Sequence, residues 1–175
     1  KGQYDKALKE YQSLLKAVPK DANLRLKIGD LHLKLGEAPR AIEAYTQVAE
    51  EFSKGGFDAK AVAIYKQILR VNEAHLEARV ALGDHFQRMG LKSDALREFQ
   101  AAVGLCQRRE LKREAFDLLK RVASLDPRNV SNRLHLADLL QREGLAKEAR
   151  EEYGALLAEV APQSGVEQVV RIAEQ

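Results

Sequence analysis

Six alanines recur along this chain at alternating intervals of 34 and 20 residues. An aromatic residue or leucine follows each alanine after four residues, and an aliphatic or small residue follows three residues later. Spacings of three and four keep side chains on one face of a helix. The pattern predicts an array of helices that repeats every 54 residues, marked by Ala7, Ala41, Ala61, Ala95, Ala115 and Ala149.

A glycine precedes most of these alanines by five residues. We expect it to end the preceding helix, because glycine adopts the left-handed conformation without a steric penalty at Cβ. Pro19 and Pro127 stand near the ends of two helices and cannot continue them. The glycines in this position are Gly2, Gly36, Gly56, Gly90 and Gly144.

Glycine, alanine, tyrosine, an aliphatic residue and proline in this order, with a 34-residue step, resemble the tetratricopeptide repeat. The resemblance covers about residues 2–160. It implies an all-α fold, a right-handed α-solenoid of antiparallel helices. The 20-residue steps depart from the family, because helices 38–54 and 92–108 then carry the signatures of both helices of a repeat. Arginines also replace the aromatic residue near the start of the first helix, namely Arg25, Arg79 and Arg133.

The periodicity predicts about ten helices with short connections. Asp21 and Asn129 are predicted N-caps, and Pro39 suits a first turn. Leu24–Ile28 alternates apolar and polar residues as a strand would, but its counterparts do not alternate cleanly, so helix is favoured. The predicted ranges are 3–18, 22–35, 38–54, 57–71, 75–89, 92–108, 111–125, 129–143, 146–160 and 164–174.

We expect one solenoid over residues 1–175, built of three super-repeats at about 4–57, 58–111 and 112–165. Residues 1–18 look like a second helix without its first helix, and neither end carries a clear capping helix. We therefore expect either a longer parent protein or self-association through the uncapped ends.

Composition narrows the class of protein. No run of about 18 apolar residues is present, so no membrane span is expected. The lone Cys106 excludes an internal disulfide and fits a reducing compartment. The net charge of +3 does not require a polyanionic partner. We expect a cytoplasmic protein, and the compact repeats marked by glycine and alanine are typical of bacterial chains.

The resemblance implies that the first helices of each unit line a concave groove for a partner protein. Its mixture of aliphatic and charged side chains suits an extended peptide or a partner helix. Aspartates stand where some family members grip a C-terminal carboxylate, so binding of that kind is rejected. The predicted groove residues are Asn23, Leu26, Asp30, Lys34, Glu77, Val80, Asp84, Arg88, Ser131, Leu134, Asp138 and Arg142.

Structural interpretations compete with binding at several of these positions. The aspartates stand four residues before a lysine or arginine, a spacing that stabilises a helix by about 0.2–0.5 kcal/mol per pair. The three arginines near the helix starts form either a basic ridge or stems packed between helices. Structural roles are favoured for both sets, and the pairs are Asp30–Lys34, Asp84–Arg88 and Asp138–Arg142.

The sequence also has features of two other classes of function, nucleic-acid binding and catalysis. Residues 88–121 are locally basic and predict, as an alternative, a helical-repeat nucleic-acid binder, although acidic residues interrupt the run and few aromatic residues are available for stacking. Enzyme signals are poor. Ser13 and Lys16 match an acylating-enzyme spacing without its companion motifs, and no histidine has metal-ligand spacing.

The sequence therefore predicts a non-enzymatic scaffold for a peptide segment or helix of a partner protein, with no cofactor and no metal. The alternatives are the nucleic-acid binder and a self-assembling structural solenoid.

Overall fold

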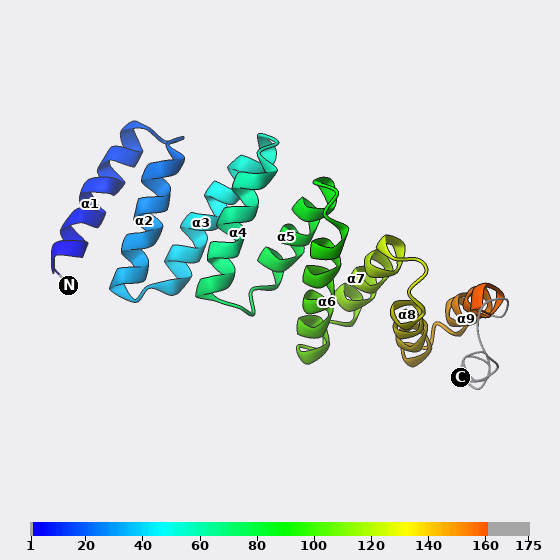
Figure 1. Cartoon of the computed structure of the whole chain (residues 1–175). Helices are drawn as coiled ribbons and strands as arrows, with labels where there is room; N and C mark the ends of the chain where they lie inside the picture. Colours follow the sequence, from blue (N-terminus) through cyan, green and yellow to red (C-terminus); the bar gives the residue numbers. More distant parts are fainter. Residues whose placement is uncertain (1, 161–175) are drawn as a thin grey trace. The chain divides into compact units, whose positions relative to one another are not determined.

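The computed structural model describes residues 2–160, and every regular element in this part of the chain is an α-helix (Figure 1). The all-α prediction is confirmed, and the predicted tenth helix at 164–174 lies outside the described residues. None of these helices has the length and apolarity needed to span a bilayer. The helices are α1 (Gly2–Ala17), α2 (Ala22–Leu35), α3 (Ala38–Lys54), α4 (Asp58–Val71), α5 (Leu76–Arg88), α6 (Lys92–Arg108), α7 (Lys112–Leu125), α8 (Val130–Arg142) and α9 (Ala146–Val160).

The helix starts repeat with the period read from the alanines. α2, α5 and α8 begin at Ala22, Leu76 and Val130, each 54 residues after the last. The starts of α3, α6 and α9, and those of α4 and α7, have the same spacing. The 54-residue, three-helix period is thus a property of the backbone. The exact super-repeat boundaries stay a prediction.

Local signals explain where helices begin. The Asp21 carboxylate accepts a hydrogen bond from the Leu24 amide at 3.0 Å, and the Asn129 side chain accepts one from the Asn132 amide at 3.1 Å. Both predicted N-caps are confirmed. His75 caps α5 in the same way, through Nδ1 and the Ala78 amide, and was not predicted.

The turns between helices need left-handed backbone. Gly36 has φ +83°, and Gly56, Gly90 and Gly144 have φ between +75° and +77°, as predicted. The equivalent position before α7 holds Glu110 at φ +57°, where a side chain is strained.

The chain divides into two compact units, residues 1–95 and 96–175, with the boundary inside α6. In the first unit each helix packs against its neighbour in the chain, from α1 to α5. Its core is centred on α3, where Ala41, Tyr45, Val48 and Ala49 are fully buried. Gly29 of α2 lies so close to the Tyr45 ring that a Cβ there would be 2.5 Å from Cε1. This contact explains the small residue predicted at that position.

In the second unit α7 packs on α8 and α8 on α9. Arg121 of α7 lies over the Phe99 ring of α6, 4.1 Å from its centroid. Two side-chain bonds join α6 to α8, from Gln100 to Asn132 at 3.0 Å and between Gln107 and His135 at 2.9 Å. Cys106 is fully buried as a small apolar residue.

Candidate interaction surface

The predicted groove residues lie on the outward faces of α2, α5 and α8. On α2 and α5, both in the first unit, Asn23, Asp30, Lys34, Glu77 and Arg88 are exposed. Each helix adds a half-buried aliphatic residue. On α8, in the second unit, Ser131 and Arg142 are exposed. The other predicted groove residues are half-buried, namely Leu26, Val80, Asp84, Leu134 and Asp138.

One of these residues is held by neighbours from two other helices. Asp30 of α2 accepts a hydrogen bond from the Tyr45 hydroxyl of α3 at 2.5 Å and another from Gln67 of α4 at 3.3 Å. Burial first, and then the Asp30 carboxylate, raise the pKa of Tyr45 well above its usual range. The phenol therefore keeps its proton and acts as a permanent donor, which fixes the carboxylate on the outward face.

The second unit repeats this construction. The Tyr153 hydroxyl of α9 donates to Asp138 of α8 at 2.6 Å, and burial together with Asp138 raises the pKa of Tyr153 to about 12. Asp138 and Tyr153 are the third-repeat equivalents of Asp30 and Tyr45. Asp84, the second-repeat equivalent, has Phe99 at the tyrosine position, and a phenyl ring cannot donate.

The predicted pairing along each helix stays a prediction, but two members of the pairs contact groups on other helices. Lys34 lies over the Tyr4 ring, 5.4 Å from its centroid. Arg88 binds Asp58 of α4 through Nε at 3.0 Å and Nη2 at 2.8 Å. Lys34 and Arg88 thus each contact the preceding helix.

The arginine column is structural. The side chains of Arg25, Arg79 and Arg133 are only 13–15% exposed. Arg25 donates to the Pro19 carbonyl and to Glu51, and Arg133 pairs with Glu152 at 3.2 Å. The stems are packed and the guanidinium groups are occupied, which favours the packing interpretation over a basic ridge.

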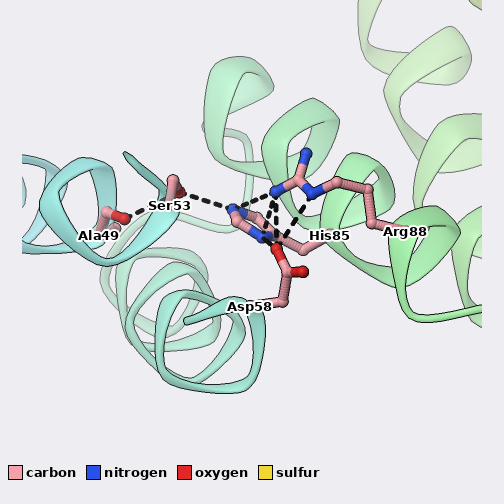
Figure 2. A network of polar contacts seen from close by, with 5 residues as sticks. All are labelled: Ala49, Ser53, Asp58, His85 and Arg88. Carbon is pink, nitrogen blue, oxygen red and sulfur yellow. Dashed lines mark hydrogen bonds and ion pairs between the residues drawn. The ribbon is translucent and has the colours of Figure 1, made fainter. Parts of the chain in front are cut away.

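A polar network that sequence reasoning missed joins α3, α4 and α5 (Figure 2). Ser53 Oγ lies 2.7 Å from His85 Nε2, and His85 Nδ1 lies 2.6 Å from Asp58 Oδ1. Arg88 approaches the same carboxylate oxygen, and Arg88 first, followed by His85, holds the pKa of Asp58 below its usual range. The available signal was a histidine at a position that is leucine in both other repeats, Leu31 and Leu139.

Serine, histidine and aspartate in this order match the residue types of a hydrolase triad. Here the Ser53 hydroxyl donates its proton to the Ala49 carbonyl at 2.8 Å, so its oxygen accepts from His85. A general base would have to take that proton instead. His85 is only 2% exposed. The geometry therefore suits a clamp between helix ends rather than an activated nucleophile.

A cavity of about 530 Å³ opens on the other side of α2. Arg25, Ile28 and His32 of α2 line it, with Gln12 of α1 and Gln47 of α3 among the walls. At 100° per residue these α2 positions point away from Asn23, Leu26 and Asp30. The first unit thus has two distinct faces that a partner could use, and only one was predicted.

Ionic chemistry elsewhere is modest. In the basic region of the second unit, Lys112 pairs with Glu143 at 3.0 Å and Lys120 lies over the Phe116 ring. Within residues 2–160, no three His, Cys, Asp or Glu side chains gather as metal ligands would.

Comparison with known proteins gives a family match over part of the chain and a set of similar structures. A family model described as a tetratricopeptide repeat matches residues 1–56. No curated protein matches the sequence.

Similar solved structures include MamA 41-end from Desulfovibrio magneticus RS-1, with 17% identity, TM-score 0.35, and coverage of 83% of this chain and 98% of that one. YrrB, described as a protein with an unusual peptide-binding site, has 18% identity, TM-score 0.35, and coverage of 66% and 67%. A kinesin light chain protein of Podosopora anserina with TPR-like repeats has 17% identity, TM-score 0.44, and coverage of 90% and 92%.

Proposed function

Because a family model described as a tetratricopeptide repeat matches residues 1–56, we propose that this chain is a non-enzymatic protein–protein interaction scaffold. It binds a peptide segment or a helix of a partner protein along the outward faces of α2 and α5 in the first unit, and the outward face of α8 is a separate candidate surface in the second unit. The observation that carries the proposal is the Asp30 carboxylate, exposed on the predicted face and fixed there by Tyr45 and Gln67.

A fixed polar group favours binding because less conformational freedom is lost when the partner arrives. Leu26 and Val80 are half-buried, so they offer apolar contact without a mobile side chain. Exposed charges around them orient the partner and exclude others of the wrong charge. A cytoplasmic location and a bacterial source belong to the same proposal.

The experiment begins with affinity capture with the purified chain as bait and identification of the bound partner by mass spectrometry. Binding is then measured for two paired variants. Asn23→Arg with Glu77→Arg adds charge on the predicted face, and Gln12→Arg with Gln47→Arg adds it at the cavity. Substitution of Arg88 is avoided, because Arg88 is bound to Asp58.

We expect the first pair to weaken binding at least about tenfold, which is about 1.4 kcal/mol, and the second to leave it unchanged. Unchanged binding by the first pair would show that the predicted face is not the site. Loss in the second pair alone would move the site to the cavity face.

A further inference from the structure

All the exposed large hydrophobic residues of the first unit except Tyr4 lie toward one end of its helices. Successive helices run in opposite directions, so the turns at 18–21, 55–57 and 89–91 lie at one end and those at 36–37 and 72–75 at the other (Figure 1). Phe57 is 55% exposed, Met89 41% and Leu91 42%, and Val18 is also exposed. In the described chain, the turns at the opposite end carry no exposed large hydrophobic residue. We call Phe57, Met89 and Leu91 the turn edge.

The members of the turn edge are held near one another. Asp58 binds Arg88 at 2.8 Å, and these residues directly follow Phe57 and precede Met89 in the sequence. Phe57 also packs edge-on against Phe52, with ring centroids 6.4 Å apart. The polar network of Figure 2 therefore joins the residues next to Phe57 and Met89 and links the two turns.

Folding of the repeat does not require apolar residues at two of these positions. The 54-residue equivalents of Met89 are Leu35 and Glu143 and those of Leu91 are Glu37 and Leu145, whereas those of Phe57 are Gln3, inside α1, and Leu111. The fold thus accepts a polar side chain in the turn at the Met89 and Leu91 positions. Contiguous exposed apolar residues that folding does not need are a mark of an interaction site.

Cations surround the turn edge. The Lys60 ammonium lies over the Phe57 and Phe52 rings, 5.0 and 5.4 Å from their centroids. Lys54 and Lys92 are exposed nearby in sequence, and Arg88 is half-exposed beside its carboxylate partner. Lys54 pairs with Glu50 at 3.9 Å and Arg88 with Asp58 at 2.8 Å, which leaves Lys60 and Lys92 as the cations beside the turn edge that can meet an acidic partner.

We propose that the turn edge is a second interaction surface, distinct from the groove, which binds an acidic protein segment carrying a large apolar anchor. The anchor packs on Phe57, Met89 and Leu91, while its flanking carboxylates meet Lys60 and Lys92. A membrane surface fits less well, because stable electrostatic attachment takes clusters of about 4–8 basic residues or a second anchor.

The probe is a fluorescein-labelled 12-residue peptide of Glu and Asp with two Leu and one Phe, followed by fluorescence anisotropy against the purified chain. A matched peptide has Lys in place of every acid. The test variant is Phe57→Gln with Met89→Gln and Leu91→Gln. The control is Leu145→Gln, which removes an equally exposed leucine from a turn of the second unit.

We expect the acidic peptide to bind, with at least tenfold loss in the triple variant and less than twofold change in Leu145→Gln. Lys60→Gln should weaken binding and reduce its dependence on salt. Circular dichroism of each variant checks that the helices persist.

The proposal is overturned if the acidic peptide does not bind, if the lysine peptide binds equally well, or if the triple variant binds as the parent does. Two results would show that the partner is of another kind. One is a dimer in light scattering that the triple variant loses, and the other is binding to vesicles of phosphatidylcholine and phosphatidylserine without binding to the peptide. Neither set of outcomes involves Asn23 or Glu77, so failure here leaves the groove proposal intact.

Discussion

The helix pairs α2–α3 and α8–α9 are equivalent in the 54-residue repeat, and one lies in each unit. They differ in the small residue that precedes the aspartate. Both carry an aspartate bonded to a tyrosine 15 residues later, Asp30–Tyr45 and Asp138–Tyr153. Directly before the aspartate, α2 has Gly29, which lies against the Tyr45 ring. At the equivalent position α8 has Ala137, which carries a Cβ and is fully buried. The polar bond is therefore kept while the small residue beside it varies with the space available.

A second comparison concerns the starts of α4 and α7. Asp58 begins α4 and binds Arg88 at the end of α5, whereas Lys112 begins α7 and binds Glu143 just after α8. The charges are reversed at equivalent starting residues. Both junctions thus have an ionic link, with opposite charges at the equivalent starting residues.

The largest effect should come from the close approach at Gly29. Alanine in a helix interior normally gains about 1 kcal/mol over glycine. At this position the added methyl would meet the buried Tyr45 ring, and overpacking of this kind costs about 1–3 kcal/mol. We expect Gly29→Ala to lower the free energy of unfolding in urea. The matched Ala137→Gly should also destabilise, through cavity and propensity alone. A stabilised Gly29→Ala would contradict the close contact.

The tyrosine–aspartate bonds should give the next largest effect. Tyr45→Phe removes a donor to a charged acceptor and should cost about 1–2 kcal/mol, with a smaller loss for Tyr153→Phe, and thermal or urea unfolding measures both. Phe99 is the internal control, because that repeat already lacks the hydroxyl.

The same tyrosines predict alkaline sensitivity. A pKa raised in the folded state means that the neutral phenol stabilises the fold fully below its unfolded pKa of about 10, and that this contribution is lost as pH rises further. For Tyr153 the loss runs up to about pH 12. Burial also raises the pKa of Tyr65, so absorbance titration at the phenolate band should show three late-titrating tyrosines, and Tyr45→Phe and Tyr153→Phe should each lack one. Titration of every tyrosine near the usual pKa of about 10 would contradict this prediction.

The turn before α7 should give a gain of intermediate size. Glu110 has φ +57° where the preceding repeat has Gly56 at φ +75°. Left-handed backbone costs a non-glycine residue about 1 kcal/mol, so Glu110→Gly should stabilise by about 0.5–1 kcal/mol and Gly56→Ala should destabilise by a similar amount. Equal stabilities for parent and Glu110→Gly in thermal melts would show that the turn relieves the strain elsewhere.

The ionic links should give the smallest effect. Lys112 is largely exposed, and Lys112→Ala should cost about 0.2–1 kcal/mol, less at high salt. Because Arg88 and then His85 lower the pKa of Asp58, its contribution is present at neutral pH and is lost as pH falls through the acidic range. Asp58→Asn should remove part of this acid dependence, and Lys112→Ala should leave that part in place. Identical acid unfolding curves for parent and Asp58→Asn would exclude the link.

The sequence by itself determined the helices, their period and their turns. α2, α3, α6 and α9 begin and end at the predicted residues, because apolar spacing, caps and turn glycines act over three to five neighbouring positions. Part of the candidate surface could also be predicted, because the same periodicity decides which side of α2 is exposed.

Only the tertiary structure decided which side chains meet. Spacing along α2 and α5 suggested partners four residues away, yet Asp30 is held by residues 15 and 37 positions later and Arg88 by one 30 positions earlier. Ser53 of α3 and His85 of α5 are 32 residues apart in the sequence and share a hydrogen bond that no local sequence pattern predicts. Helix formation is a matter of near neighbours, but a side chain at a helix end chooses among whatever groups the packing of adjacent helices brings within about 3 Å.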